Sequence, residues 1–199
     1  MIYHGMPLKL SINGVLLNWR DLIKYMLADK NGCLEFDGWR FSYDYGVMYL
    51  RERKYWNYYI SPTGIRGKVI VDIGGGCGET AKFFIEHGAS KVIVIESNPI
   101  CKPYLEYNSK HHPELGYYMI NFHPSQLNHI AYDLLKLDIE GYELELLPYL
   151  KYINQDIILE SHCNYITDKF IKDGFELVNG FNRNKEIYGG VVQLCRWKK

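Results

Sequence analysis

The chain has 199 residues, of which 47% are hydrophobic and 23% are charged, and its 23 basic residues balance its 23 acidic ones. This length suits one globular domain with a small addition. The zero net charge excludes the general attraction to phosphate backbones on which histone-like proteins depend, and the aromatic content of 15% excludes a disordered chain.

Neither membrane insertion nor thiol chemistry is indicated by the sequence. No apolar run approaches the roughly 18 to 20 residues that span a bilayer, and the first residues do not resemble a secretory leader, so we expect a cytoplasmic protein. The five cysteines are scattered without a C-x-x-C pair. This pattern favours reduced, buried thiols over a zinc site or a disulfide.

The first third of the chain differs in character from the rest. Residues 1–66 carry 9 basic and 6 acidic groups and 13 of the 30 aromatic residues, whereas residues 67–199 carry 14 basic and 17 acidic groups. Apolar residues at helical spacing predict a helix over residues 16–27, and alternation predicts a hairpin over residues 34–43 that turns at Asp37-Gly38. We therefore predict a small α+β extension over 1–66, added to a core that comprises 67–199.

From residue 67 onward, short β-branched runs alternate with segments of helical length. This alternation predicts a parallel sheet with crossover helices. The last two strand-like stretches, residues 175–181 and 186–197, are joined by so few residues that they must pair antiparallel. The runs expected to form the parallel strands are residues 68–73, 91–96, 117–122, 133–137 and 157–160.

The strongest local signal is the segment V-I-V-D-I-G-G-G-C-G-E-T, which begins at Val69. An apolar strand breaks into glycines and continues into a helix, so the backbone can approach a ligand closely and the helix offers free N–H groups. Asp72 at the strand end would repel a pyrophosphate, which argues against a dinucleotide, and no Gly-Lys-Ser/Thr follows to form a P-loop. The next strand ends in Glu96, whose carboxylate can accept hydrogen bonds from both hydroxyls of a ribose.

The loop from Asp72 to Gly78, taken with Glu96, resembles the cofactor site of the class I S-adenosylmethionine-dependent methyltransferases. The resemblance covers residues 67–199 and implies a Rossmann-like, seven-stranded, mostly parallel sheet closed by a C-terminal antiparallel hairpin. It also implies S-adenosylmethionine as the cofactor, with the glycine loop against its methionine part and Glu96 on its ribose. The third strand is not followed by an acid that would bind the adenine amine, and Asn121 is the candidate substitute. The implied cofactor residues are Asp72, Gly74, Gly76, Gly78, Glu79, Glu96 and Asn121.

A second motif, K-x-D-x-E-G-x-E, begins at Lys136 and resembles the FkbM-like branch of these methyltransferases. That branch implies O-methylation of a sugar or of a small or lipid-linked hydroxyl compound. Because a hydroxyl group loses its proton as it attacks the methyl carbon, a base is needed. The candidates are Asp138, then His162 and Glu140, although Glu140 equally suits the dipole of the following helix. As an alternative that we do not favour, Asp138, Glu160 and His162 bind a divalent cation that orients the hydroxyl.

The aromatic and mildly basic stretch over residues 51–59 leaves further functions open. We expect the N-terminal extension to lie across the carboxyl edge of the sheet and to form part of the acceptor pocket, where its rings can stack on a sugar and Arg51 and Arg53 can bind a carboxylate or phosphate. The same rings and cations also suit RNA or simple packing on the core. An RNA methyltransferase is the main alternative, although the fourth strand ends in D-I-E-G and lacks the D/N-P-P-Y motif of adenine-N6 enzymes. The other alternative is a cofactor-binding partner subunit without activity. The sequence leaves the oligomeric state open.

Overall fold

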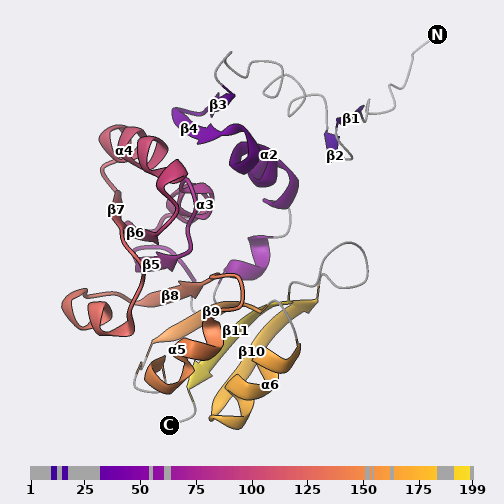
Figure 1. Cartoon of the computed structure of the whole chain (residues 1–199), viewed down its shortest axis with the longest axis vertical. Helices are drawn as coiled ribbons and strands as arrows, with labels where there is room; N and C mark the ends of the chain where they lie inside the picture. The colour runs from indigo at the N-terminus through magenta and orange to yellow at the C-terminus, as the bar shows by residue number, and fades with distance from the viewer. Residues whose placement is uncertain are drawn as a thin grey trace.

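The structure is a computed structural model that describes residues 10–12, 15–17, 32–53, 56–60, 64–150, 153, 155–161, 164–182 and 191–197. The central sheet is formed by β5 (Val69–Ile73), β6 (Lys91–Glu96), β7 (Leu115–Met119), β8 (Leu134–Leu137), β9 (Asp156–Ser161), β10 (Phe175–Asn182) and β11 (Val191–Trp197). The strand order is β10-β11-β9-β8-β5-β6-β7 (Figure 1). The five strands from β9 to β7 run parallel, which confirms the predicted α/β, Rossmann-like fold with a parallel sheet. β11 pairs antiparallel with both β9 and β10.

Helices cover both faces of this sheet, because its strands direct alternate side chains into two apolar clusters. In β8, for example, Leu134 belongs to one cluster and Leu135 to the other. The first cluster contains side chains of α3 (Glu79–Glu86) and α4 (Lys102–His111), and the second contains side chains of α5 (Glu143–Leu150) and α6 (Asn164–Lys172). None of the helices in the described residues is long and apolar enough to cross a membrane.

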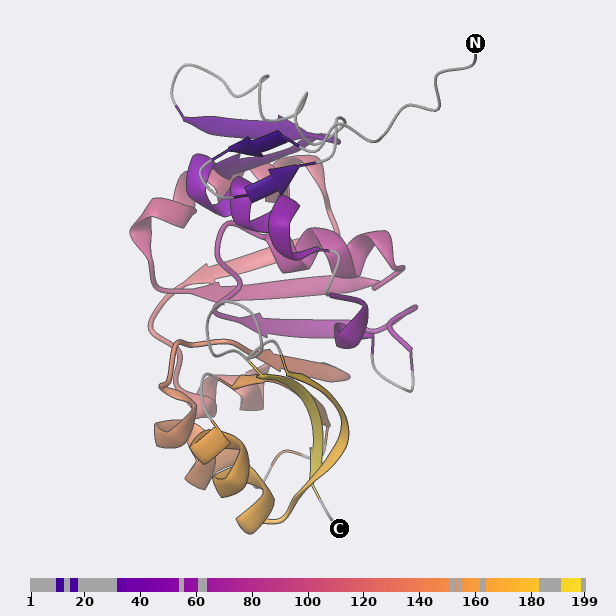
Figure 2. The ribbon, with the colours of Figure 1, turned by 90° about the vertical axis from the view of Figure 1, so that its right-hand side faces the viewer.

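The N-terminal segment contains the predicted hairpin. β3 (Cys33–Phe36) and β4 (Trp39–Ser42) pair antiparallel, which confirms the turn at Asp37-Gly38. Both turn residues have positive φ, 55° for Asp37 and 79° for Gly38, as a two-residue hairpin turn requires. The hairpin leads directly into α2 (Tyr43–Glu52), which is followed by the 3-10 turn η1 (Trp56–Tyr59) (Figure 2).

The hairpin packs on the helices of the core. The side chain of Asn108 in α4 accepts a hydrogen bond from the backbone N–H of Arg40 and donates one to the Arg40 carbonyl, each at 2.8 Å. The ring of Trp39 stacks on His112, with the ring centroids 4.2 Å apart. Buried rings from both parts of the chain belong to one apolar cluster, so the N-terminal segment and the core share a hydrophobic interface. The domain boundary at residue 67 stays a prediction.

The helix predicted over residues 16–27 is wrong at its start. Leu16 and Leu17 lie in strand β2 (Val15–Leu17), which pairs antiparallel with β1 (Leu10–Ile12). The sequence between these strands is Asn13-Gly14, the dipeptide most typical of a tight hairpin, and this turn signal outweighs the helical spacing of the leucines. The remainder of the predicted helix lies outside the described residues.

Candidate active site

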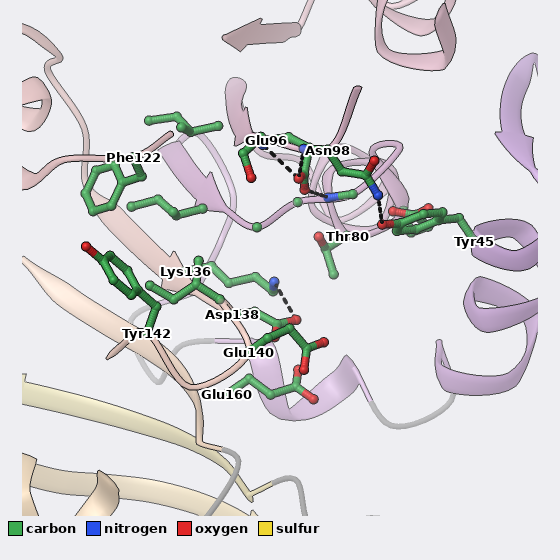
Figure 3. Close-up of a pocket in the computed structure, with 18 of the residues that line it drawn as sticks. Tyr45, Thr80, Glu96, Asn98, Phe122, Lys136, Asp138, Glu140, Tyr142 and Glu160 are labelled. Atoms are coloured by element: carbon green, nitrogen blue, oxygen red, sulfur yellow. Dashed lines mark hydrogen bonds and ion pairs between the residues drawn. The ribbon is translucent and has the colours of Figure 1, made fainter. Parts of the chain in front are cut away.

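A cavity of about 760 Å³ lies where the carboxyl ends of the parallel strands meet (Figure 3). Its walls come from the loops that follow β5, β6, β7 and β8, from the end of β9, and from α2 and η1 of the N-terminal segment. Ligands of open α/β sheets bind at this edge, and the volume lies within the range of small-molecule sites. The cavity is therefore the candidate active site.

The glycine loop forms one wall, and its glycines are required by the space around them. Gly74 and Gly76 have φ values of 75° and 55°, a region that disfavours other residues. A Cβ atom on Gly74 would lie 1.7 Å from the carbonyl oxygen of Asp138, and one on Gly76 would lie 2.7 Å from both Tyr45 and Glu79. The bare backbone of Gly74 to Gly76 consequently borders the cavity, as the predicted cofactor cradle requires.

Glu96 ends β6 and lies at the cavity wall, where it was predicted to meet a ribose. Its Oε2 accepts a hydrogen bond from the backbone N–H of Gly76 at 2.9 Å, and its Oε1 accepts two from Ser97 and Asn98 at 2.8 and 2.7 Å. These three bonds fix the carboxylate and use three of its roughly four acceptor sites, so one site, on Oε2, remains for a ligand hydroxyl. Glu96 thus links the glycine loop to the loop after β6.

Asp72 does not face the cavity, contrary to the prediction that it meets the ligand. Its side chain is fully buried, and its carboxylate accepts a hydrogen bond from the Thr80 hydroxyl and lies 3.2 Å from Nζ of Lys136. The cause is strand register, because Asp72 and Lys136 are direct partners in the parallel pair of β5 and β8. The Asp72 carboxylate instead lies next to Gly75, where an added Cβ would come within 2.9 Å of its Oδ2.

Lys136 is the buried cation of the site. Its ammonium group lies 3.2 Å from Asp72 and 3.3 Å from Asp138. Burial alone lowers the pKa of Lys136, but the carboxylates of Asp72, Asp138 and Glu160 outweigh that effect, so the pKa is raised above its ordinary value. Lys136 therefore stays charged at neutral pH and holds Asp138 at the cavity wall.

Carboxylates from two strand ends gather beside Lys136 (Figure 3). Asp138 is a quarter exposed, and Glu140 has a φ of 55°, which is unusual for a residue with a side chain. Glu160 is almost fully buried, and its Oε2 accepts a hydrogen bond from the Tyr59 hydroxyl at 2.6 Å. All three acids line the cavity, whereas His162 lies outside the described residues.

The described residues contain no group of three His, Cys, Asp or Glu side chains that could hold a metal ion. The positive charge between Asp72 and Asp138 is already supplied by the ammonium group of Lys136. Because the alternative cation site also needs His162, its third ligand falls outside the described part of the chain.

The N-terminal segment supplies the wall opposite the sheet. Tyr45, Met48 and Glu52 follow one another at helical spacing on α2 and line the cavity, together with Trp56 and Tyr59 of η1. Arg51 and Arg53, the predicted acceptor contacts, do not line it. Arg51 is exposed in the last turn of α2, and the guanidinium of Arg53 lies 5.6 Å from the Tyr49 ring.

The loop after β7 forms the remaining wall. Strand β7 covers Leu115–Met119, so it begins and ends earlier than the predicted run over residues 117–122. Ile120, Asn121 and Phe122 consequently follow the strand and line the cavity. This places the exposed Asn121 on the wall where an adenine contact was predicted.

Glu79, another predicted cofactor residue, is buried in the first turn of α3 and lines the cavity. Its Oε1 accepts a hydrogen bond from the Cys77 backbone N–H at 3.3 Å. Burial is the main reason that the pKa of Glu79 is raised well above its ordinary value. Folding thus makes Glu79 harder to ionise than an exposed glutamate.

Because of this pKa shift, we predict that Glu79→Gln stabilises the folded protein by an amount that depends on pH. A carboxyl group whose folded pKa exceeds its unfolded pKa reduces stability as pH rises above the unfolded value, by about 1.4 kcal/mol for each unit of difference. Relative to the original protein, the variant should therefore be more stabilised at pH 8 than at pH 5, as measured by urea denaturation. The exposed Glu145→Gln serves as the control and should show no such difference, and a pH-independent effect of Glu79→Gln would contradict the prediction.

Lys136 and Tyr45 are among the residues lining the cavity that were not predicted as site residues. Lys136 carried a signal, because a lysine in the apolar run L-L-K-L of a buried strand requires acidic partners nearby. Tyr45 carried none, since only the tertiary packing of α2 brings it to the cavity, whereas Tyr59 belongs to the aromatic stretch over residues 51–59.

Comparisons with known proteins give matches to structures alone. Neither a protein-family model nor a curated protein matches the chain. Among solved structures, a ribosomal protein L11 methylase from Lactobacillus delbrueckii subsp. bulgaricus matches with a TM-score of 0.58 and 14% identity over 86% of this chain and 84% of that one. Aeropyrum pernix fibrillarin with natively bound S-adenosylmethionine matches with a TM-score of 0.55 and 12% identity. The match covers 65% of this chain and just 66% of the fibrillarin chain.

A third match is a precorrin-6y C5,15-methyltransferase from Geobacter metallireducens, with a TM-score of 0.50 and 17% identity over 67% of this chain and 82% of that one. The names of the L11 methylase and the precorrin methyltransferase refer to different acceptors, and identities this low show the fold only. The chain has the α/β fold of the class I S-adenosylmethionine-dependent methyltransferases.

Proposed function

We propose that this protein is an S-adenosylmethionine-dependent methyltransferase of the FkbM-like branch that methylates a hydroxyl group of a small molecule, a sugar or a lipid-linked compound. One observation carries the proposal: a single cavity joins the glycine loop and Glu96 to the carboxylates that follow β8 and end β9. The sheet order, with β10 and β11 antiparallel at one end, supports it, because the family resemblance implies that arrangement.

The residues of the cavity fit the cofactor. Glu96 is hydrogen-bonded to both the glycine loop and the loop after β6. Its carboxylate can therefore bind the ribose of the cofactor, while the bare glycine backbone faces the methionine part. When bound, S-adenosylmethionine supplies an activated methyl group. The ring of Phe122 and the amide of Asn121 line the wall next to β7, where an adenine ring would lie.

Asp138 is the proposed base. Its carboxylate is partly exposed to the cavity and is held by Lys136, so it can take the proton that an acceptor hydroxyl loses as its oxygen attacks the methyl carbon. Lys136 keeps its charge throughout because Asp72 remains its second partner. Glu140 and Glu160 then bind the acceptor from either side through its other hydroxyl groups.

The charge of the cavity favours a neutral acceptor over a polynucleotide. Besides the cofactor contacts, the wall carries Glu52, Asp138, Glu140 and Glu160, and Lys136 is the one cation among the described residues that line it. A phosphate-rich chain would be repelled by this excess of carboxylates, whereas hydroxyl groups can donate hydrogen bonds to them. The aromatic side chains of Trp56 and Tyr59 offer stacking faces for a sugar ring.

The acceptor class is tested by incubation of the protein with tritiated S-adenosylmethionine and a fractionated cell extract. We expect label in small or lipid-linked material. Label in RNA would replace the proposed acceptor with the polynucleotide alternative. Cofactor binding without label in any fraction would favour the inactive partner subunit.

Cofactor binding predicts a specific effect of Glu96→Ala. The variant should bind S-adenosylmethionine more weakly by roughly 1.5 to 3 kcal/mol, the range for hydrogen bonds to a charged group. Calorimetric titration measures the change, and Glu106→Ala, an exposed site on α4, should leave affinity unchanged. Equal affinity of the Glu96 variant and the original protein would remove the ribose role.

A further inference from the structure

Tyr45 occupies a position that joins the two halves of the proposed cofactor site. It lies in the first turn of α2, in the N-terminal segment, and it lines the cavity. Its ring atoms Cε1 and Cδ1 lie 2.7 and 2.9 Å from the point where a Cβ on Gly76 would be placed. Its hydroxyl accepts a hydrogen bond from the side-chain amide of Asn98 at 3.4 Å (Figure 3).

These two contacts are informative because of how the cofactor is built. In S-adenosylmethionine the sulfur atom is bonded both to the ribose and to the methionine chain. The proposed ribose partner, Glu96, accepts a hydrogen bond from the Asn98 backbone, and the glycine loop that includes Gly76 is the proposed methionine cradle. A side chain that touches both Gly76 and Asn98 therefore lies beside the link between the two parts, which is the sulfonium centre.

We infer that Tyr45 is a specificity-determining residue whose ring contacts the sulfonium end of the cofactor and favours the charged methyl donor over the neutral product. The inference rests on the proposed function. Aromatic rings attract cations through the negative charge of their faces. S-adenosylmethionine carries a positive charge on sulfur, whereas S-adenosylhomocysteine carries none, so only the donor gains from the ring.

The ring acts in its neutral form. Burial is the main reason that the pKa of Tyr45 is raised above its ordinary value, and nearby groups including Cys101 and Glu96 raise it further. Tyr45 therefore keeps its proton across the physiological range. A neutral ring that attracts the donor but not the product aids exchange after transfer, because the attraction disappears when the methyl group leaves.

This inference also changes the part played by the N-terminal segment. The glycine loop and Glu96 belong to the core, but Tyr45 belongs to α2, which also carries Met48 and Glu52 on the acceptor side of the wall. One helix thus borders both ligands. The cofactor site is complete only when α2 is packed against the glycine loop.

The test is calorimetric titration of the full chain with S-adenosylmethionine and with S-adenosylhomocysteine. Tyr45→Leu should weaken binding of the donor roughly 2- to 30-fold more than binding of the product. Tyr45→Phe removes the hydroxyl but keeps the ring, so it should preserve the ratio of the two affinities. Tyr43→Leu, on the same helix but not at the cavity wall, should also preserve it.

An equal loss of both affinities in Tyr45→Leu, or no loss, would overturn the role of the ring and leave the proposed function intact. If Tyr45→Leu does not fold, Tyr45→Met fills similar space without a ring and gives the same comparison. If the original protein binds neither ligand, the proposed function fails, and this inference fails with it.

Discussion

Asp138→Asn should slow methyl transfer by about 100- to 10,000-fold, the contribution typical of a general base. Asparagine has nearly the shape of aspartate but cannot take a proton. Lys136 keeps Asp72 as its partner in the variant, so the buried ammonium group remains compensated. The cofactor affinity should change far less than the rate, because the proposed ribose contact is Glu96, and Asp138 is proposed to contact the acceptor.

The rate is measured as single-turnover transfer of tritium from S-adenosylmethionine to the extract fraction that the original protein labels. Calorimetry measures the cofactor affinity. Glu145→Gln, an exposed position in α5, is the matched control and should retain the original rate. Wild-type turnover in Asp138→Asn would make Asp138 structural. If a chelator abolishes the activity and magnesium restores it, the cation alternative replaces the base.

Gly74→Ala should destabilise the protein and weaken cofactor binding, and its effect should exceed that of a glycine replacement elsewhere. A Cβ atom at residue 74 would lie 1.7 Å from the carbonyl oxygen of Asp138, and this backbone atom cannot move without shifting the end of β8. The unfavourable φ and the forced overpacking together should cost about 2 to 5 kcal/mol of unfolding free energy.

Gly67→Ala separates the cost of the unfavourable φ from the cost of the contact between an added Cβ and Asp138. Its φ of 76° matches the 75° of Gly74, but no atom lies within 4 Å of the added Cβ. It should therefore lose only about 1 to 2 kcal/mol, measured by urea denaturation, and should keep its cofactor affinity. Similar losses in both variants would show that the contact between the glycine loop and Asp138 is not close.

The sheet could be predicted from the sequence because its signals are local. Short β-branched runs separated by helical segments identify parallel strands, and Asp37-Gly38 identifies a hairpin turn. Among the described elements, the helix predicted from Leu16 failed because the apolar spacing fitted both a helix and a strand, and the hairpin signal of the Asn13-Gly14 sequence was overlooked. Strand ends were less predictable, as β7 shows.

The candidate site was only partly predictable, because its geometry depends on contacts between distant segments. The glycine loop, Glu96 and Asp138 follow strands directly, so their position at one sheet edge follows from the strand order. The ion pair of Asp72 with Lys136 depends on register between two strands that are far apart in sequence. The cavity wall formed by α2 and η1 depends on how the N-terminal segment packs. Arg51 and Arg53, the acceptor contacts predicted from the sequence, do not line that wall, whereas Trp56 and Tyr59 of the same stretch do.

The central claim is that the cavity at the strand ends holds S-adenosylmethionine. The most direct measurement is calorimetric titration of the full chain with S-adenosylmethionine and, separately, with NAD. The account predicts one binding site per chain for S-adenosylmethionine and no measurable binding of NAD. The glycine run that follows β5 directly, from Gly74, has Glu79 where a dinucleotide fingerprint has glycine or alanine. Binding of NAD, or no binding of S-adenosylmethionine by the folded protein, would contradict it.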